Sequence, residues 1–140
     1  MESREGAARH FLVLGAGDRL AAVEVRWVRR IARALPVTPL PGARPQLLGL
    51  AQFAGEPLPV LDLAQLLGAG PGQPSRFPVT VVIWAGQDKE LVGLAADAAL
   101  ELVSITADAL IPVGEGIVAA EVALPQGTAE LIDVTRLDIA

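Results

Sequence analysis

Two stretches of the chain share one order of apolar and polar positions. FLVLGAGDRLAAVEV (11–25) and VVIWAGQDKELVGLA (81–95) each contain an apolar run, a turn rich in Gly and Asp, and a second apolar run. Two apolar runs joined by a few turn residues are typical of a β-hairpin. The pattern therefore predicts a hairpin near the start of each half of the chain.

Further strands are predicted later in each half. The runs LLGLAQF (47–53) and PLPVLDL (57–63) follow the first hairpin, and GIVAAEVAL (116–124) and AELIDV (129–134) follow the second. Each pair ends in a short helical turn. Many short strands, frequent turn residues and few helix-length periodic stretches indicate an all-β fold of paired small barrels rather than an α/β sheet.

The segment VRWVRRIARAL (25–35) is ambiguous. Its arginines recur at helical spacing, so periodicity alone predicts a helix with a basic face. These arginines are Arg26, Arg29, Arg30 and Arg33. We interpret the segment as a short helical turn that passes into a strand, and its counterpart AADAALELVSI (95–105) as helix-compatible at its start and strand-like at its end. Three interpretations of such a basic row are open. It contacts an acidic partner, it binds anionic lipid as a membrane-surface module, or it is only exposed to solvent.

The two halves align without a gap when the second is shifted back by 71 positions. The identical pairs are Gly15/Gly86, Leu20/Leu91, Pro41/Pro112, Asp62/Asp133 and Leu66/Leu137. GAGPGQPSRFP (68–78), with three glycines and three prolines, separates the halves. We therefore expect a flexible N-terminal tail over 1–9 and a single domain over 10–140, made of two pseudo-repeated subdomains at roughly 10–70 and 78–140.

The composition narrows the range of functions. Apolar residues make up 52% of the 140 residues and charged residues 19%, which excludes a disordered chain. The 16 acidic and 11 basic residues disfavour nucleic-acid binding. The chain has no cysteine, no tyrosine and one histidine, His10, so we expect no enzyme, no metal site and no cofactor. An apolar signal segment is missing, and so is a run of about 18 apolar residues, so we expect a cytoplasmic protein.

Asp62 and Asp133 are the sharpest candidates for chemistry. Two aspartates related by a repeat can form a shared-proton pair, as in pseudo-symmetric aspartic proteases, so a carboxylate-dependent hydrolase is an alternative function. Such sites need a small residue and a glycine directly after each aspartate, and this chain has no glycine there. The other role is helix capping, with Gln65 completing a capping box and Gly68 ending the turn. We favour capping.

Taken in order, these motifs resemble the CheW family of chemotaxis coupling proteins. The resemblance rests on VRWVRRI (25–31), GLAQFAGEPLPVLDL (49–63) and VGLAAD (92–97), and it extends from about His10 to Leu137. It implies two intertwined five-stranded SH3-like β-barrels with short helical turns around a shared core. It also implies a non-enzymatic adaptor that couples the cytoplasmic tips of chemoreceptors to the regulatory domain of a CheA-type histidine kinase. Contact with the membrane is then only indirect, through the receptors.

The resemblance also implies a partner-binding surface on the barrels. Its expected residues are Val28, Arg30, Ile31, Leu50, Phe53, Ala54 and Gly55. Ala54 stands where the family usually has arginine before the turn glycine, Gln52 stands for the usual asparagine, and Arg30 lies where glutamate is frequent. The first change removes a planar group with several donors, and the last reverses a charge. We therefore expect either a coupling protein with a divergent partner or a member that has lost one of its two contacts.

Overall fold

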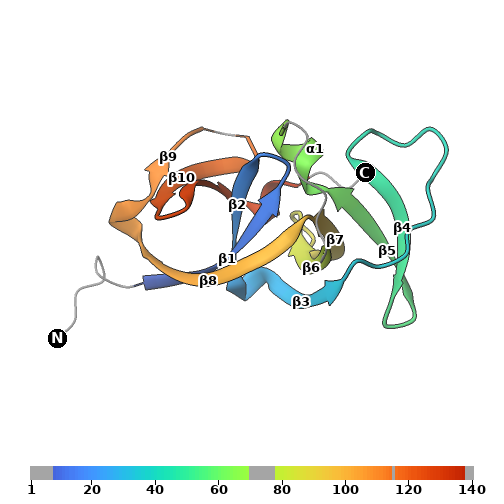
Figure 1. Ribbon diagram of the computed structural model, residues 1–140. Helices are drawn as coiled ribbons and strands as arrows, with labels where there is room; N and C mark the ends of the chain where they lie inside the picture. The colour runs from blue at the N-terminus through green and yellow to red at the C-terminus, as the bar shows by residue number, and fades with distance from the viewer. Residues whose placement is uncertain (1–7, 70–77, 115, 138–140) are drawn as a thin grey trace.

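The computed structural model describes residues 8–69, 78–114 and 116–137 (Figure 1). The first half contains β1 (Ala8–Ala16), β2 (Arg19–Glu24), the 3₁₀ turn η2 (Val25–Trp27), β3 (Val28–Arg33), β4 (Leu47–Phe53), β5 (Glu56–Asp62) and α1 (Leu63–Leu67). The second half contains β6 (Val79–Ala85), β7 (Glu90–Ala96), β8 (Ala98–Thr106), η3 (Ala107–Ala109), β9 (Ile111–Pro112), β10 (Val118–Leu124), β11 (Gly127–Ile132) and η4 (Val134–Arg136). The prediction of an all-β protein with short helical turns is confirmed.

The strands form two sheets, and each sheet takes strands from both halves of the chain. Sheet A has the order β8-β1-β2-β11-β10-β9, and sheet B has the order β3-β6-β7-β5-β4. Within the described residues, the halves meet through the parallel pairs β2/β11 and β5/β7 and the antiparallel pairs β1/β8 and β3/β6. In Figure 1, β9 and β10 lie at one end of the molecule, and β4 and β5 lie at the other.

The hairpins predicted near the start of each half are present as β1/β2 and β6/β7. The repeat is visible in later elements too: β10 starts 71 residues after β4 (118 − 47), and β11 starts 71 residues after β5 (127 − 56). The strand pairing departs from the simple repeat along β1. Ile31 of β3 pairs with Val81. Their repeat counterparts are Leu102 (31 + 71) and His10 (81 − 71), but His10 pairs with Ser104, two residues beyond Leu102. The β1/β8 register is therefore shifted by two residues, and the β1/β2 register is shifted with it, because Ala16 pairs with Arg19 whereas Ala85 pairs with Glu90.

The segment 25–35 forms a 3₁₀ turn and then a strand, as predicted, so its arginines do not share one helical face. Its counterpart differs from the prediction, because β7 ends at Ala96 and β8 begins at Ala98 with no helical turn between them. Pairing of both strands with neighbours in the sheets outweighs the helix propensity of the alanines. Strand β1 begins at Ala8, so Ala8 and Arg9 of the expected tail belong to sheet A. Residues 1–7 lie outside the described residues.

One apolar core is shared by both halves. It includes Leu12 and Val23 from the first hairpin and Ile83 and Leu94 from the second, all almost completely buried. Burial of each such side chain contributes about 1.5–3 kcal/mol. Two smaller clusters lie within sheet A and sheet B, around Phe11 and around residues that include Val60. Because the larger core draws on both hairpins, neither half buries its apolar residues alone.

Candidate functional site

The structure places the expected partner-binding residues on the two edges of sheet B. Val28, Arg30 and Ile31 belong to β3, and Leu50 and Phe53 belong to β4. Although β3 and β4 are the outermost strands of this sheet, Arg29 connects them. Its guanidinium carbon lies 5.9 Å from the centre of the Phe53 ring. This one contact joins the two edge strands that carry the expected residues, and we call these residues together with Arg29 the sheet B seam.

Arg29 was not among the expected site residues. It is the extra residue of a β-bulge, because Val28 pairs with Ile83 and Arg30 pairs with the next residue, Val82. A bulge re-aims the side chain that it carries. The position of Arg29 in the arginine row was a visible signal, but helical periodicity did not predict that this particular arginine would lie against Phe53.

The β3 side of the sheet B seam is basic and partly apolar. Ile31 is 46% exposed, and Arg29, Arg30 and Arg33 are exposed around it. Val28 is half-buried and packs against the shared core. The chain as a whole carries a formal net charge of −5, so this edge opposes the average charge of the molecule. Such a surface fits a partner that offers acidic and apolar groups together.

The β4 side is closed by a returning segment of the chain. The Leu50 N–H donates to the Thr38 carbonyl over 3.0 Å, and the Thr38 N–H donates to the Leu50 carbonyl over 2.8 Å. Leu50 also lines a shallow hollow of about 460 Å³ beside Pro36 and Pro57. The backbone of Leu50 is thus already paired, and only its side chain is available to a partner. Phe53 is half-buried against the sheet B cluster.

The turn between β4 and β5 consists of Ala54 and Gly55, both exposed. Their φ angles are +51° and +82°, which places both residues in the left-handed region. Consecutive positive φ values are typical of the two-residue turns that join strands tightly. Alanine tolerates this conformation less well than glycine. The turn projects beyond Phe53 at the tip of the hairpin.

The two repeat-related aspartates cap helical turns. The Asp62 carboxylate accepts a hydrogen bond of 3.1 Å from the Ala64 N–H, and the Asp133 carboxylate accepts one of 3.1 Å from the Thr135 N–H. Asp133 also accepts a bond from the Thr135 hydroxyl over 2.6 Å and pairs with Arg136 over 3.0 Å. Each carboxylate is therefore engaged by its own turn, as capping requires, and this geometry gives the hydrolase alternative no support.

The expected capping box is incomplete. The N–H of Asp62 donates to the Gln46 carbonyl over 2.7 Å, so it is already satisfied without the Gln65 side chain. The end of the turn agrees with the prediction, because Gly68 adopts φ +65° at the C-terminus of α1. A bond from the Ala69 N–H to the Ala64 carbonyl over 2.9 Å completes a Schellman arrangement.

Asp97, the last residue of the VGLAAD motif, anchors the turn between β1 and β2. Its carboxylate accepts a hydrogen bond of 2.8 Å from the Gly17 N–H, and its own N–H donates to the Gly15 carbonyl over 2.8 Å. The motif thus joins the two halves of the chain. His10 lies beside Ser104, with 3.0 Å between its Nδ1 atom and the serine hydroxyl. Over the described ranges, no group of three His, Cys, Asp or Glu residues could hold a metal ion.

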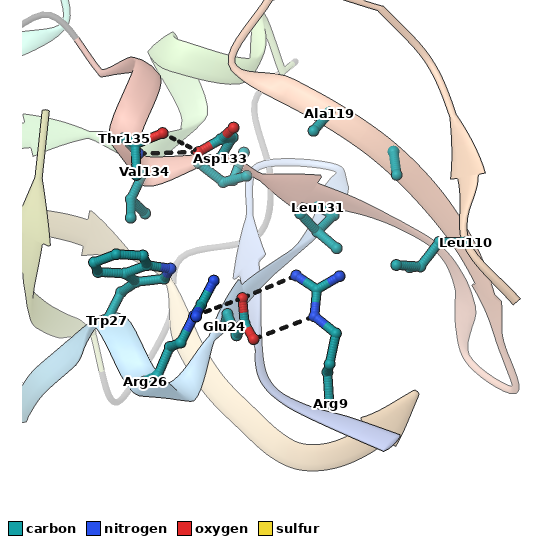
Figure 2. Close-up of a pocket in the computed structure, with 12 residues that line it drawn as sticks. Arg9, Glu24, Arg26, Trp27, Leu110, Ala119, Leu131, Asp133, Val134 and Thr135 are labelled. Carbon is teal, nitrogen blue, oxygen red and sulfur yellow. Dashed lines mark hydrogen bonds and ion pairs between the residues drawn. The ribbon is translucent and has the colours of Figure 1, made fainter. Parts of the chain in front are cut away.

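A second feature, absent from the sequence predictions, is an ion-pair cluster on sheet A formed by Arg9, Glu24 and Arg26 (Figure 2). Arg9 donates to Glu24 through Nε at 3.2 Å and through one Nη at 2.9 Å. Arg26 Nε lies 3.2 Å from the same carboxylate and its guanidinium lies 4.9 Å from the Trp27 ring centre. We call these three residues the arginine–glutamate cluster.

Burial opposes ionisation of Glu24, but the hydrogen bond and charge of Arg9, reinforced by Arg26, hold the pKa of Glu24 below its ordinary value. The same hydrogen bond raises the pKa of Arg9. All three groups are therefore charged near neutral pH, and the cluster carries one surplus positive charge.

No helix within the described part of the chain is long and apolar enough to cross a membrane.

Residues 10–138 match a family model described as a CheW-like domain. A probable chemotaxis protein CheW of Rhizobium etli is 31% identical over 107 residues, which cover 76% of this chain and 68% of that protein. A chemotaxis protein CheW of Rhizobium meliloti is 30% identical over 98 residues, which cover 70% of this chain and 62% of that protein. The crystal structure of the scaffolding protein TtCheW from Thermoanaerobacter tengcongensis is similar in fold, with a TM-score of 0.78, 18% identity and coverage of 91% and 90% of the two chains.

Proposed function

This chain belongs to the CheW-like domain family, and from that premise we propose that it is a cytoplasmic, non-enzymatic adaptor that couples chemoreceptors to a CheA-type histidine kinase. The matched relatives carry the names of chemotaxis proteins, which supports a role in chemotaxis-type signal transduction. Binding rather than turnover is then the output of the molecule. The proposal assigns the kinase regulatory domain and the cytoplasmic tip of a receptor as the two partners.

We assign the kinase contact to the sheet B seam. The observation that carries this assignment is Ile31, a β-branched apolar side chain that is 46% exposed on an edge strand and surrounded by arginines. Apolar anchors at the centre of an interface, surrounded by charges that steer the partner, account for most of the binding energy in protein complexes. Phe53 and the Ala54–Gly55 turn extend the same surface. The partner surface should be apolar at its centre and acidic at its rim.

The test is isothermal titration of the purified protein against the regulatory domain of the cognate kinase. Ile31→Asp should weaken binding by about tenfold or more, because it puts a desolvated charge at the anchor position. Leu102→Asp is the matched control: Leu102 is an exposed apolar residue on β8, the repeat-related edge strand of sheet A. Equal affinities of the two variants would refute the assignment to the sheet B seam.

The departure at Ala54 is tested in the same titration. Binding by the wild type shows that an arginine at position 54 is dispensable for the kinase contact. If Ala54→Arg binds the kinase domain and the wild type does not, the chain is a coupling scaffold that no longer binds the usual partner of the family. Kinase binding without receptor binding, measured in a pull-down with the receptor tip, supports a member that has lost one contact and contradicts a divergent kinase partner.

A further inference from the structure

A hollow of about 310 Å³ lies beside the arginine–glutamate cluster of sheet A (Figure 2). Its walls come from both halves of the chain, because β1, β2 and η2 supply the cluster and Trp27, and β10, β11 and η4 supply the opposite side. The volume equals that of about ten liquid waters. It falls at the lower end of the range of pockets that hold small ligands.

The charge of the hollow favours an anion. Arg9 and Arg26 share the single carboxylate of Glu24, which leaves one positive charge uncompensated within the cluster. The other carboxylate on the wall, Asp133, forms an ion pair with Arg136 at 3.0 Å and accepts a hydrogen bond from the hydroxyl of Thr135. The surplus charge therefore meets no unpaired acid among the described residues that line the hollow.

The cluster also keeps hydrogen-bond donors in reserve. Arg26 contacts Glu24 through Nε, and over the described residues neither of its Nη atoms has a hydrogen-bond partner. Arg9 uses Nε and one Nη on Glu24, which leaves the other Nη without a partner among the described residues. Glu24 holds both guanidinium groups in place, and Figure 2 shows its carboxylate between them. Ordered guanidinium donors lose little entropy when they bind a carboxylate.

Apart from Asp133 and Thr135, the remaining walls are apolar. Figure 2 shows the Trp27 ring on one side of the hollow and Leu131, Leu110 and Ala119 on the other. Leu131 is almost fully buried, so its side of the wall is fixed by packing. A ligand with a flat or branched apolar body can lie between these side chains while its charged end meets Arg26. A fully hydrophilic anion such as phosphate would leave the apolar walls uncovered.

From this juxtaposition we propose that the hollow binds a small carboxylate with an apolar body, either a free acid or the C-terminal carboxylate of a peptide that ends in an apolar residue. The site lies between sheet A and η2, which leads directly into β3 of the sheet B seam, and its residues are not those to which we assign the kinase contact. It would give the adaptor a ligand-binding function of its own.

Trp27 supplies the readout, because it lines the hollow and the chain has only one other tryptophan, Trp84. In the full-length Trp84→Phe variant, phenylacetate should change the Trp27 emission in a saturable way. Phenylacetamide has the same shape without the charge and should bind at least about fivefold more weakly. Adding Arg26→Gln should weaken phenylacetate binding about tenfold. Arg26 has a side chain that is 67% exposed, so this variant should fold normally, which circular dichroism checks.

Arg33→Gln is the matched control, since Arg33 is an exposed arginine of β3 that does not line the hollow. It makes the same change in net charge and should leave the affinity unchanged. The proposal would be overturned if phenylacetate and phenylacetamide bound equally, or if Arg26→Gln and Arg33→Gln had equal effects. It would also be overturned if neither phenylacetate nor the peptide acid N-acetylglycyl-phenylalanine gave a saturable signal. N-acetylglycyl-phenylalanine and its C-terminal amide are titrated in parallel. Tighter binding of this peptide acid than of phenylacetate identifies a protein C-terminus as the source, and the reverse identifies a free acid.

Discussion

Strands β3 and β8 occupy equivalent places in the two halves of the chain but present different chemistry. Each forms the edge of a sheet and contains a bulge, and the extra residues, Arg29 and Leu100, lie 71 positions apart (100 − 29). On β3 the bulge residue lies over the Phe53 ring. On β8 the bulge residue is 49% exposed, and Leu102 near it is 67% exposed. The repeated backbone has kept its bulges while the exposed side chains have diverged.

The difference teaches how one strand arrangement produces two kinds of edge. Charged side chains on an edge strand discourage non-specific pairing with other chains, and the arginines of β3 serve this purpose. The β8 edge offers an apolar surface with Glu101 as its one exposed charged residue over the described strand. The chain that follows each strand returns to an equivalent strand. After β3 it returns at Thr38 to pair with Leu50 of β4, and after β8 and η3 it returns at Ile111 to pair with Glu121 of β10, the counterpart of Leu50 (50 + 71).

The largest effect should come from breaking the return at Thr38. A Cβ added to Gly49 would lie 2.1 Å from the Thr38 carbonyl oxygen, and Gly49 adopts φ +146°. Gly49→Ala should therefore lower the free energy of unfolding by about 3 kcal/mol or more, measured by urea denaturation. The repeat-related residue is Ala120 (49 + 71), so Ala120→Gly is the comparison. It should cost only about 1 kcal/mol, and equal losses would show that the close approach of Thr38 does not require glycine at position 49.

The caps at the ends of the two halves should differ by a smaller amount. Asp133 holds the N–H and the hydroxyl of Thr135 as well as Arg136, whereas Asp62 holds the Ala64 N–H. Asp133→Ala should lower the free energy of unfolding by about 2 kcal/mol and Asp62→Ala by about 1 kcal/mol. The asparagine variants of both residues retain an acceptor and should recover most of the loss. A larger loss at Asp62 would contradict the ranking.

Local patterns predicted the parts of this molecule that depend on neighbours in sequence. The hairpins, the 3₁₀ turn before β3 and the two caps are determined within a few residues, so apolar periodicity and capping signals were sufficient. The Arg29–Phe53 contact and the arginine–glutamate cluster join residues 24 and 15 positions apart (53 − 29 and 24 − 9). Their formation depends on how sheets curve and on which strands pair, and local periodicity carries no information on either. The same limit explains why the two-residue shift of β1 was not predicted.

The arginine–glutamate cluster gives sheet A a contribution to the free energy of unfolding that depends on pH. Its acid, Glu24, has Ala95 as its repeat counterpart (24 + 71), so only sheet A has this group. Because the folded pKa of Glu24 is lowered, its stabilisation is present above the unfolded value of about 4.3 and is lost as the pH falls through the folded pKa. Glu24→Gln should remove about 0.5 kcal/mol at pH 7, since Arg9 and Arg26 are partly exposed.

Thermal unfolding of the wild type and Glu24→Gln from pH 7 to pH 3 measures this contribution. The difference in melting temperature between the two proteins should shrink as the pH falls below the ordinary glutamate range. Glu101→Gln on the β8 edge is the control, and it should show a smaller pH-dependent difference, because no arginine is paired with Glu101 among the described residues. A constant difference for Glu24→Gln across the whole pH range would contradict the lowered pKa.

An effect as small as that of Glu24→Gln concerns the turns at the tips of the two later hairpins. Ala54 has φ +51°, whereas its counterpart Pro125 (54 + 71) is not among the residues with positive φ. Ala54→Gly should raise the free energy of unfolding by about 0.5 kcal/mol, because relief of the left-handed strain exceeds the entropy that glycine adds to the unfolded chain. Ala54→Val should lower it, since a β-branched residue fits this conformation least well. A wild type more stable than Ala54→Gly would mean that the alanine stabilises the turn through contacts that outweigh its strain.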